Sequence, residues 1–164
     1  MTKKMEVKRI ATAHDGVGDI CSVKTTINGQ RALLVSVYIT PGTPMSKVED
    51  FFELNLMAYS HKVVGLFKSV DKLQLSTIPI ILGGDLNVDL KSAECVEFLY
   101  LMRDNWKLEL NNDPAISTTR GNTCIDAVFT RHVEHLQTMT FISYFSYHKP
   151  LLSITAQPLS VTGD

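Results

Sequence analysis

The sequence lacks any long run of apolar residues, and this absence excludes a membrane-spanning helix. Its longest apolar stretch, around residues 78–82, is far shorter than the ~18 residues that a spanning helix needs. The start of the chain, MTKKMEVKRI, lacks the apolar core of a secretion signal. We therefore expect an intracellular protein, nuclear or cytoplasmic, with no membrane partner.

An excess of charge of one sign is also missing, and cysteine is scarce. Sixteen basic residues against seventeen acidic ones give a formal net charge of −1, so any contact with a polyanion must be local. The three cysteines, Cys21, Cys95 and Cys124, lie far apart and show no CxxC spacing. This pattern argues against a disulfide framework or a zinc site and favours buried, reduced thiols.

Length and composition favour a single domain over residues 1–164. Hydrophobic residues make up 45% of the chain and charged residues 20%, a balance typical of soluble globular proteins. No internal repeat, low-complexity tract or linker divides the sequence. Only the ends, residues 1–5 and 160–164, are expected to fray.

The chain predicts about seven strands, with antiparallel pairing near both ends. The first two β-branched runs flank Asn28-Gly29, which favours a tight hairpin because both residues tolerate positive φ. The third run is short and continuously apolar, which is typical of a central strand that is buried on both faces. The expected strands are 19–27, 31–39, 78–82, 106–110, 123–130, 138–144 and 151–156.

Two helices are expected between these strands. The first begins with the capping-box pair Ser46 and Glu49 and keeps an apolar face through about residue 70. The second spans about 92–103, with Ser92 as its cap. Its inner face is expected to carry Val96, Leu99 and Met102. The predicted fold class is therefore α/β, with helices packed on a mixed, mostly antiparallel sheet.

Three segments place polar side chains at the ends of β-type runs. Gly83-Gly84 follows the central strand and lets the backbone turn, so Asp85 and Asn87 can point out of its end. Asp126 lies in an otherwise apolar strand, where burial makes a carboxylate need a partner. His148, at the start of the last strand, can be that partner, and the contact would keep its ring protonated.

These residue types suit the cleavage of a phosphodiester. Such a reaction needs a positioned water and donors where charge builds on the phosphate. Asp85 could orient or deprotonate the water, and the Asn87 amide could donate to a phosphate oxygen. Arg120 and Lys149 lie near these motifs and could contact phosphates. The alternatives stay open: the Gly-Asp-x-Asn loop as an ordinary turn, a structural histidine, and solvated basic residues.

In their order, these motifs resemble the C-terminal part of the endonuclease/exonuclease/phosphatase superfamily. These metal-dependent phosphodiesterases include pancreatic-type deoxyribonucleases and abasic-site endonucleases. The resemblance covers about residues 19–157, and the whole segment is most similar to nuclease-like domains of eukaryotic mobile elements. The matching motifs are Gly84-Asp85-Leu86-Asn87, Ile125-Asp126-Ala127 and Ser146-Tyr147-His148-Lys149-Pro150, together with the run 34–41, which adds Tyr38 near the scissile phosphate.

The resemblance implies a half-length version of the family's β-sandwich that acts on nucleic acid, DNA rather than RNA. Mg²⁺ is the candidate cofactor, and Mn²⁺ could replace it. The implied catalytic residues are Asp85, Asn87, Asp126, His148 and Tyr38, and the implied substrate-binding residues are Arg120 and Lys149.

Two departures from the family pattern leave the metal ligands unknown. The family's first half, with its metal-binding glutamate, has no counterpart, and Glu6, Asp15 and Asp19 are stand-ins that lie in no matching motif. Tyr147 occupies the place of the aspartate in the Ser-Asp-His motif, and a phenol is a poor ligand for a hard cation.

The missing half also predicts an uncovered sheet face. A homodimer or another partner would have to cover it. The expected function is metal-assisted phosphodiester hydrolysis that is weak or absent in the isolated chain. The alternative is a catalytically dead module for nucleic-acid binding or oligomerisation that descends from such a nuclease.

Overall fold

A large mixed sheet forms the centre of the protein. The computed structural model describes residues 8–14, 16–27, 29–66 and 77–155. Its elements are β1 (Lys8–His14), β2 (Gly18–Ile27), β3 (Gln30–Ile39), α1 (Met45–Leu66), β4 (Ile80–Asp85), α3 (Cys95–Trp106), β5 (Glu109–Leu110), β6 (Asp126–Arg131), β7 (Leu136–Thr140) and β8 (Leu151–Thr155). Neither of these helices is both long and apolar enough to cross a membrane.

The large sheet has the strand order β1-β2-β3-β4-β6-β5. Only β3 and β4 pair in parallel, and α1 forms the crossover that such a pair requires. All other neighbours in this sheet pair antiparallel. The predicted α/β class, with a mixed and mostly antiparallel sheet, is therefore confirmed.

The predicted hairpin between β2 and β3 is present. Ile27 pairs with Gln30, which leaves two residues between the strands, and Gly29 has a φ of 81°. The strand β1, which pairs with β2, was not predicted. Its sequence begins with Lys8 and Arg9, and charged residues on an edge strand hide the alternation that marks a half-buried strand.

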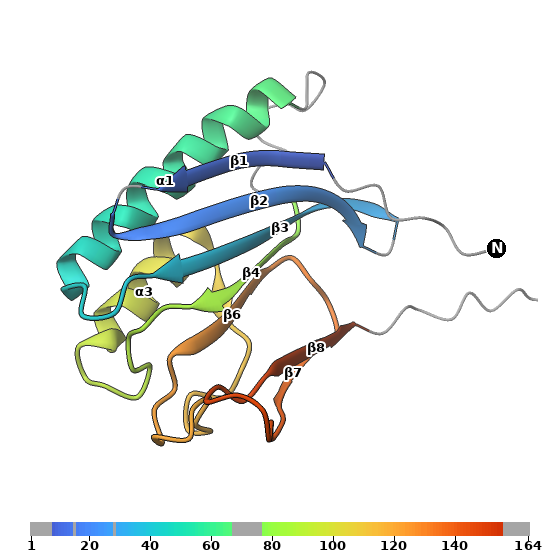
Figure 1. The fold of residues 1–164 in the computed structure, drawn as a ribbon. Coiled ribbons are helices and arrows are strands. Elements are labelled where there is room, and N and C mark those ends of the chain that lie inside the picture. The colour runs from blue at the N-terminus through green and yellow to red at the C-terminus, as the bar shows by residue number, and fades with distance from the viewer. Residues whose placement is uncertain (1–7, 15, 28, 67–76, 156–164) are drawn as a thin grey trace, which may run out of the picture.

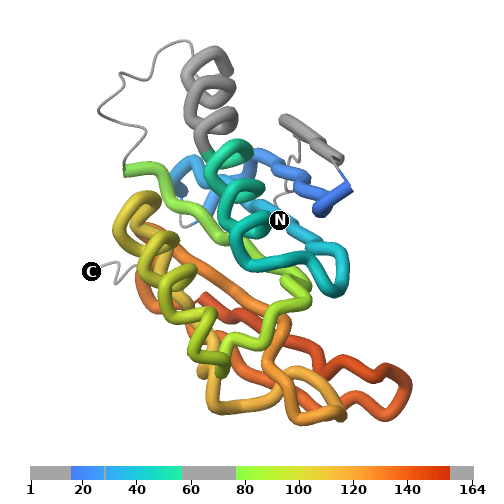
Figure 2. The backbone as a smooth tube through the Cα atoms, turned by 90° about the vertical axis from the view of Figure 1, so that its left-hand side faces the viewer, coloured from blue at the N-terminus to red at the C-terminus, as the bar shows by residue number. Residues whose placement is uncertain are grey.

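Both helices cover the same face of the large sheet (Figure 1). Figure 2 shows them in front of the strands when the molecule is turned. Phe98 of α3 lies at the centre of this layer, with its ring centroid 5.2 Å from that of Phe52 on α1 and 6.2 Å from that of Phe129 on β6. All three side chains are fully buried, so this contact joins both helices to the sheet.

The first helix differs from the prediction at its start. It begins at Met45, and the Pro44 carbonyl accepts from Lys47 and Val48, so Ser46 lies inside the first turn and is not the cap. The expected extension to residue 70 lies outside the described residues.

The second helix begins and ends three residues later than predicted, at Cys95 and Trp106, and its N-cap is Glu94 rather than Ser92. Met102 is buried as predicted and Leu99 packs against the core, but Val96 is exposed. The other buried side chains of this helix are Cys95 and Phe98. The expected strand at 106–110 shrinks to Glu109–Leu110, because the helix continues to Trp106.

A second, two-stranded sheet lies on the side of β6 opposite the helices (Figures 1 and 2). It consists of the antiparallel strands β7 and β8, so the chain supplies more than the single sheet that was expected. Asn111 ties it to the large sheet, because its Nδ2 donates to the Leu136 carbonyl and its Oδ1 accepts from Thr138. The rest of this face carries half-buried apolar side chains such as Val23 and Leu34.

The packing of Phe98 predicts a large loss of stability in Phe98→Ala. Removing a buried aromatic ring leaves a cavity, and we expect a loss of about 3–5 kcal/mol in the free energy of unfolding. The matched control Val96→Ala changes an exposed side chain of the same helix and should stay within about 0.5 kcal/mol of the unmodified chain. Urea unfolding followed by circular dichroism measures both. Equal losses would contradict the helix register described above.

Candidate functional site

Three predicted site residues form a row across the large sheet. Tyr38 on β3 pairs with Asp85 at the end of β4, and Asp85 pairs with Asp126 at the start of β6. Paired residues of neighbouring strands point to the same face. That face is opposite the helices. Val37, next to Tyr38, and Ala127, next to Asp126, lie in the helix-covered core, and successive residues of a strand point to opposite faces.

Gly84 allows the strands of this row to approach closely. A Cβ atom at Gly84 would lie 1.7 Å from the carbonyl oxygen of Val37, a distance that no side chain tolerates. The glycine pair therefore does what the sequence suggested, since it lets the backbones meet next to Asp85.

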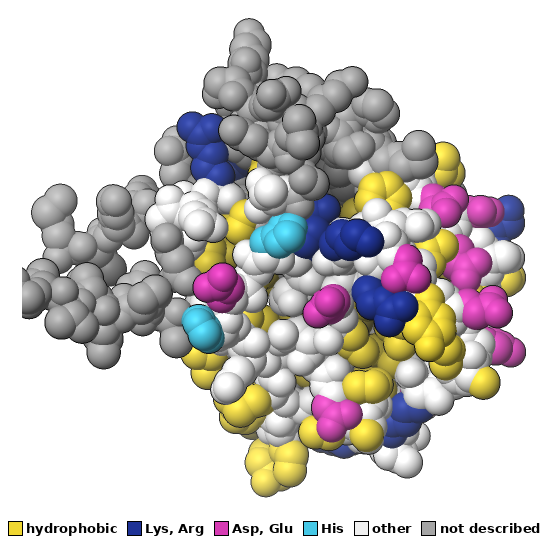
Figure 3. Space-filling model, turned by 180° about the vertical axis from the view of Figure 1, so that it is seen from behind, with side chains coloured by type: hydrophobic (Ala, Val, Ile, Leu, Met, Phe, Trp, Pro, Cys, Tyr) yellow, Lys and Arg dark blue, Asp and Glu magenta, His cyan; other side chains and the backbone are white. Residues whose placement is uncertain are grey.

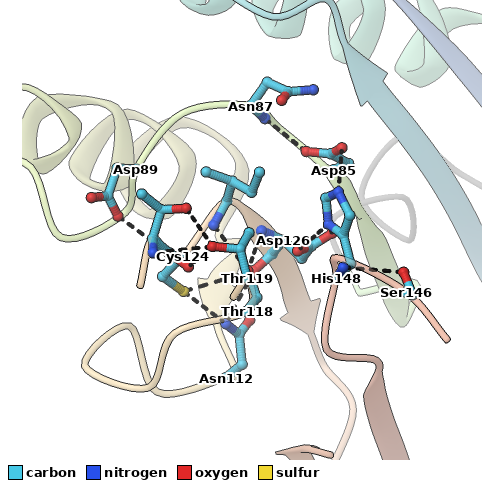
Figure 4. A network of polar contacts seen from close by, with 12 residues as sticks. Asp85, Asn87, Asp89, Asn112, Thr118, Thr119, Cys124, Asp126, Ser146 and His148 are labelled. Atoms are coloured by element: carbon cyan, nitrogen blue, oxygen red, sulfur yellow. Dashed lines mark hydrogen bonds and ion pairs between the residues drawn. The ribbon is translucent and has the colours of Figure 1, made fainter. Parts of the chain in front are cut away.

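His148 lies between the two carboxylates of the row (Figure 4). Its Nδ1 is 3.0 Å from Oδ2 and 3.2 Å from Oδ1 of Asp126. Its Nε2 is 3.9 Å from Oδ2 of Asp85, which is an ion-pair contact when the ring is protonated but exceeds hydrogen-bond distance. The predicted contact between Asp126 and His148 is therefore present, and Asp85 adds a second carboxylate.

The two carboxylates change the protonation of the ring. The hydrogen bond that the His148 ring donates to Asp126 raises the pKa of His148 above its ordinary value of 6.5, and the charges of Asp126 and Asp85 act in the same direction. Burial raises the pKa of Asp85, and the nearby charge of Asp126 adds to this effect. The site thus favours a cationic imidazole beside carboxylates that repel one another.

Backbone pairing between two loops positions His148. The Arg120 N–H donates to the Tyr147 carbonyl at 3.1 Å, and the Lys149 N–H donates to the Thr118 carbonyl at 2.7 Å. These bonds lie on either side of His148, which forms a β-bridge with Thr119. The loop at 117–123 therefore sets the height of the imidazole above Asp126.

A buried hydroxyl positions Asp126. Thr118 is fully buried, and its Oγ1 accepts from the backbone N–H groups of Ile125 at 3.0 Å and Asp126 at 3.1 Å. Asn112 holds the other side of the strand start, where its Nδ2 donates to the Asp126 carbonyl at 3.3 Å. Sequence reasoning missed both residues, because only the fold shows that Thr118 and Asn112 meet the start of β6.

A third carboxylate, Asp89, joins the loop after β4 to the segment before β6. Its Oδ1 accepts from the Cys124 N–H at 3.0 Å. Burial raises the pKa of the Cys124 thiol to about 11, so this cysteine stays protonated and serves packing. None of the three cysteines forms a disulfide, as the sequence indicated.

Asn87 supports Asp85 from the far side of the site. Its backbone N–H donates to Oδ1 of Asp85 at 3.0 Å, and its Nδ2 donates to the Ile39 carbonyl at 2.8 Å. The backbone has a φ of 50° there, which asparagine tolerates better than most residues. Figure 4 shows the Asn87 amide pointing away from His148.

The two predicted substrate-binding residues are tied to loops. The Nη2 of Arg120 donates to the carbonyls of Ser143 at 3.2 Å and Tyr144 at 3.0 Å. The Nζ of Lys149 donates to Oγ of Ser117 at 2.5 Å. Both positive charges lie next to the residues that position His148, and contact with a phosphate stays a prediction for each.

Among the residues that the structure describes, one group could hold a metal ion. Ligand atoms of Asp85, Asp126 and His148 all lie within 4.8 Å of one another. The sequence offers three carboxylates as candidate replacements for the missing glutamate. Asp19 on β2 pairs with Tyr38 on β3, and Glu6 and Asp15 lie outside the described residues. Tyr147 is exposed, and its hydroxyl lies where a side chain at Gly121 would be.

The role of Thr118 predicts that Thr118→Val destabilises the fold. Valine keeps the shape but leaves two buried N–H groups without an acceptor, which costs about 1–3 kcal/mol in the free energy of unfolding. Thr118→Ser keeps the hydroxyl and should recover most of that loss. Chemical unfolding of both variants tests this role, and a valine variant as stable as the unmodified chain would refute it.

The Asp126 contact predicts the titration of His148. Its midpoint should lie above 6.5 and should fall in Asp126→Asn, whereas Asp50→Asn on α1 should leave it unchanged. Since the folded pKa exceeds the unfolded one, the contact stabilises the fold fully below the unfolded pKa, and this stabilisation is lost as pH rises through the folded pKa. NMR of the ring protons measures the midpoint, and an unchanged value in Asp126→Asn would contradict the contact.

No protein-family model and no curated protein matches the sequence. Three solved structures are similar in fold. The endonuclease domain of TRAS1, a telomere-specific non-LTR retrotransposon, is 17% identical with a TM-score of 0.56 over 85% of this chain. The catalytic domain of human Nocturnin is 11% identical with a TM-score of 0.52 over 88%. A protein from Leptotrichia buccalis of the endonuclease/exonuclease/phosphatase family is 13% identical with a TM-score of 0.53 over 94%.

The chain spans less than two thirds of each of these proteins. It covers 63% of the TRAS1 domain, 54% of the Nocturnin domain and 60% of the bacterial protein. At these identities the likeness concerns the fold and not the activity. The chain therefore has the fold of the endonuclease/exonuclease/phosphatase proteins, over a little more than half of their length.

Proposed function

We propose that this chain is a nuclease-like domain for metal-assisted phosphodiester hydrolysis of nucleic acid, DNA in preference to RNA. The observation that carries this proposal is the imidazole of His148 held between Asp126 and Asp85 at 3.0 and 3.9 Å. The fold shared with a retrotransposon endonuclease domain supports it.

The residues of the row have separate roles in this proposal. A protonated His148 donates from Nε2 to a phosphate oxygen, and Asp126 holds the ring in that orientation. Asp85 orients the attacking water and accepts its proton, and burial, which raises its pKa, makes it a better proton acceptor than a fully solvated aspartate. Tyr38, exposed beside Asp85, binds a non-bridging oxygen. Asn87 acts through Asp85, whose carboxylate it fixes.

The donor set fits a divalent cation in part. Asp85 and Asp126 would hold the ion through carboxylate oxygens, because the protonated Nε2 of His148 has no lone pair to offer a cation. Carboxylate oxygens suit Mg²⁺, and Mn²⁺ accepts the same ligands. When bound, the ion would neutralise charge on the phosphate. With few carboxylates near, we expect weak binding and weak activity.

A catalytically dead module is the second candidate, and Tyr147 favours it. Its phenol stands where the resembling family has a metal-binding aspartate, and its hydroxyl packs at Gly121, away from the row. Such a module would bind nucleic acid through the same loops. The half-buried apolar face of the large sheet also leaves room for a second copy or another partner, which the mass in solution would reveal.

Nicking of supercoiled plasmid and cleavage of single strands in Mg²⁺ and in Mn²⁺ test the first proposal. Asp85→Ala and His148→Asn should each reduce the rate by a factor of about 10²–10³. The controls Asp50→Ala and His135→Asn change exposed residues of the same types and should cleave like the unmodified chain. If neither Asp85→Ala nor His148→Asn changes the cleavage rate, the cleavage comes from a contaminating nuclease. The catalytically dead binding module would then be the better proposal.

The variant Tyr147→Asp tests the metal in the same assay. It restores a carboxylate beside His148, so divalent-ion binding measured by calorimetry should tighten and cleavage should increase. A variant that binds no divalent ion would remove the metal from this proposal.

A further inference from the structure

A loop of exposed aromatic side chains leads directly to His148. We call residues 141–147, which connect β7 and β8, the aromatic loop. The chain has seven Phe, five Tyr and one Trp, and four of these aromatic residues lie within this loop of seven residues. That share far exceeds the 8% aromatic content of the whole sequence. Its exposed side chains are Phe141 at 44%, Ile142 at 75%, Tyr144 at 81%, Phe145 at 101% and Tyr147 at 56%.

The backbone of this loop is held in place. The Phe141 N–H donates to the Pro150 carbonyl at 2.9 Å, which closes the base of the loop. Arg120 binds its middle, through the carbonyls of Ser143 and Tyr144, and its end, through the carbonyl of Tyr147. The rings therefore project from a fixed frame, and a ligand that packs on them pays little entropy to order the backbone.

None of these rings belongs to the hydrophobic core of the described fold. Phe145 is fully exposed, and hydrophobic side chains project at the lower end of the space-filling view (Figure 3), the end where this loop lies in Figure 1. Exposed apolar patches on this scale mark interaction sites. The Tyr147 ring stands edge-on to the His148 ring, with 5.8 Å between centroids, so the patch is continuous with the candidate phosphate site.

The sequence segments that flank the loop carry basic and no acidic residues, while the carboxylates of Asp85 and Asp126 lie at the neighbouring His148. The sequence has no Asp or Glu in residues 114–125 or 135–163, although the whole chain has seventeen. Arg120 and Lys149 lie within these segments and flank the loop. A polyanion would therefore meet cations around the rings, even though the net charge of the protein is −1.

We propose that the aromatic loop binds unpaired nucleobases of the strand whose phosphate lies at His148. This inference rests on the proposed function, because it places that phosphate in the site. Tyr144 and Phe145 offer ring faces on which bases stack, and flanking cations follow the backbone. Bases within a duplex already stack on their neighbours, so the loop selects single-stranded or locally unpaired nucleic acid.

A second copy of the chain is the main competing occupant of this surface. Protein interfaces also use aromatic residues, but Arg120 and Lys149, together with the lack of acidic residues in the flanking segments, favour a polyanionic ligand. An aliphatic docking surface would show more Leu, Ile and Val than this loop, whose one aliphatic residue is Ile142.

Fluorescence anisotropy at one fixed salt concentration, with EDTA to prevent cleavage, tests the proposal. The probes are an oligothymidylate, an abasic oligonucleotide of the same length, and a duplex. The unmodified chain should bind the oligothymidylate most tightly. In Tyr144→Ala and Phe145→Ala its Kd should rise by about five- to 150-fold, while the Kd of the abasic probe stays unchanged. Tyr100→Ala, which removes an exposed aromatic ring on α3, is the control and should change neither.

Equal binding of the oligothymidylate and the abasic probe would overturn the proposal, as would equal binding of the duplex. A change from dimer to monomer in Phe145→Ala with unchanged Kd values would also overturn it and assign the surface to a second copy. The two proposals fail separately. Base-dependent binding without cleavage would support the proposal for the aromatic loop and refute the proposed hydrolysis. Cleavage together with Kd values that Phe145→Ala does not change would support the hydrolysis and refute the proposal for the loop.

Discussion

The contact between Asp126 and His148 is the interaction on which the candidate site depends. A carboxylate at a strand start is costly to bury without a partner, and the imidazole meets it at 3.0 Å. Asp85 then adds negative charge on the other side of the same ring. One imidazole between two acidic groups stays cationic to higher pH, which is the property a phosphate-binding residue needs.

Hydrogen bonds behind the site create this arrangement. The hydroxyl of Thr118 accepts two hydrogen bonds from the backbone at the start of β6. The backbone around Thr118 also pairs with both neighbours of His148. One loop thus positions the carboxylate through a side chain and the imidazole through main-chain bonds. Arg120 extends the same connection to the aromatic loop. The site and its exposed surroundings therefore form one hydrogen-bonded unit.

Much of the fold could be predicted because its signals are local. The hairpin at residues 28–29, the central strand that ends at Asp85, and the existence of two helices follow from turn residues and from periodicity. The errors arose where local signals compete. The inner face of the second helix was predicted correctly at Met102 but wrongly at Val96, because Val96 and Phe98 are both apolar and only packing against Phe129 selects Phe98.

The sequence by itself determined which chemical groups are available: Asp85, Asp126 and His148 at strand ends, and a tyrosine at 147 in place of a carboxylate. It could also indicate that Asp126 needs a partner, because an unpaired buried charge is unfavourable in any fold. Only the tertiary structure decided that Asp85 faces the same ring, that Asn87 turns away, and that Thr118 supports Asp126. Those facts depend on the register of strands distant in the chain, and register is set by the packing of the whole sheet rather than by neighbouring residues.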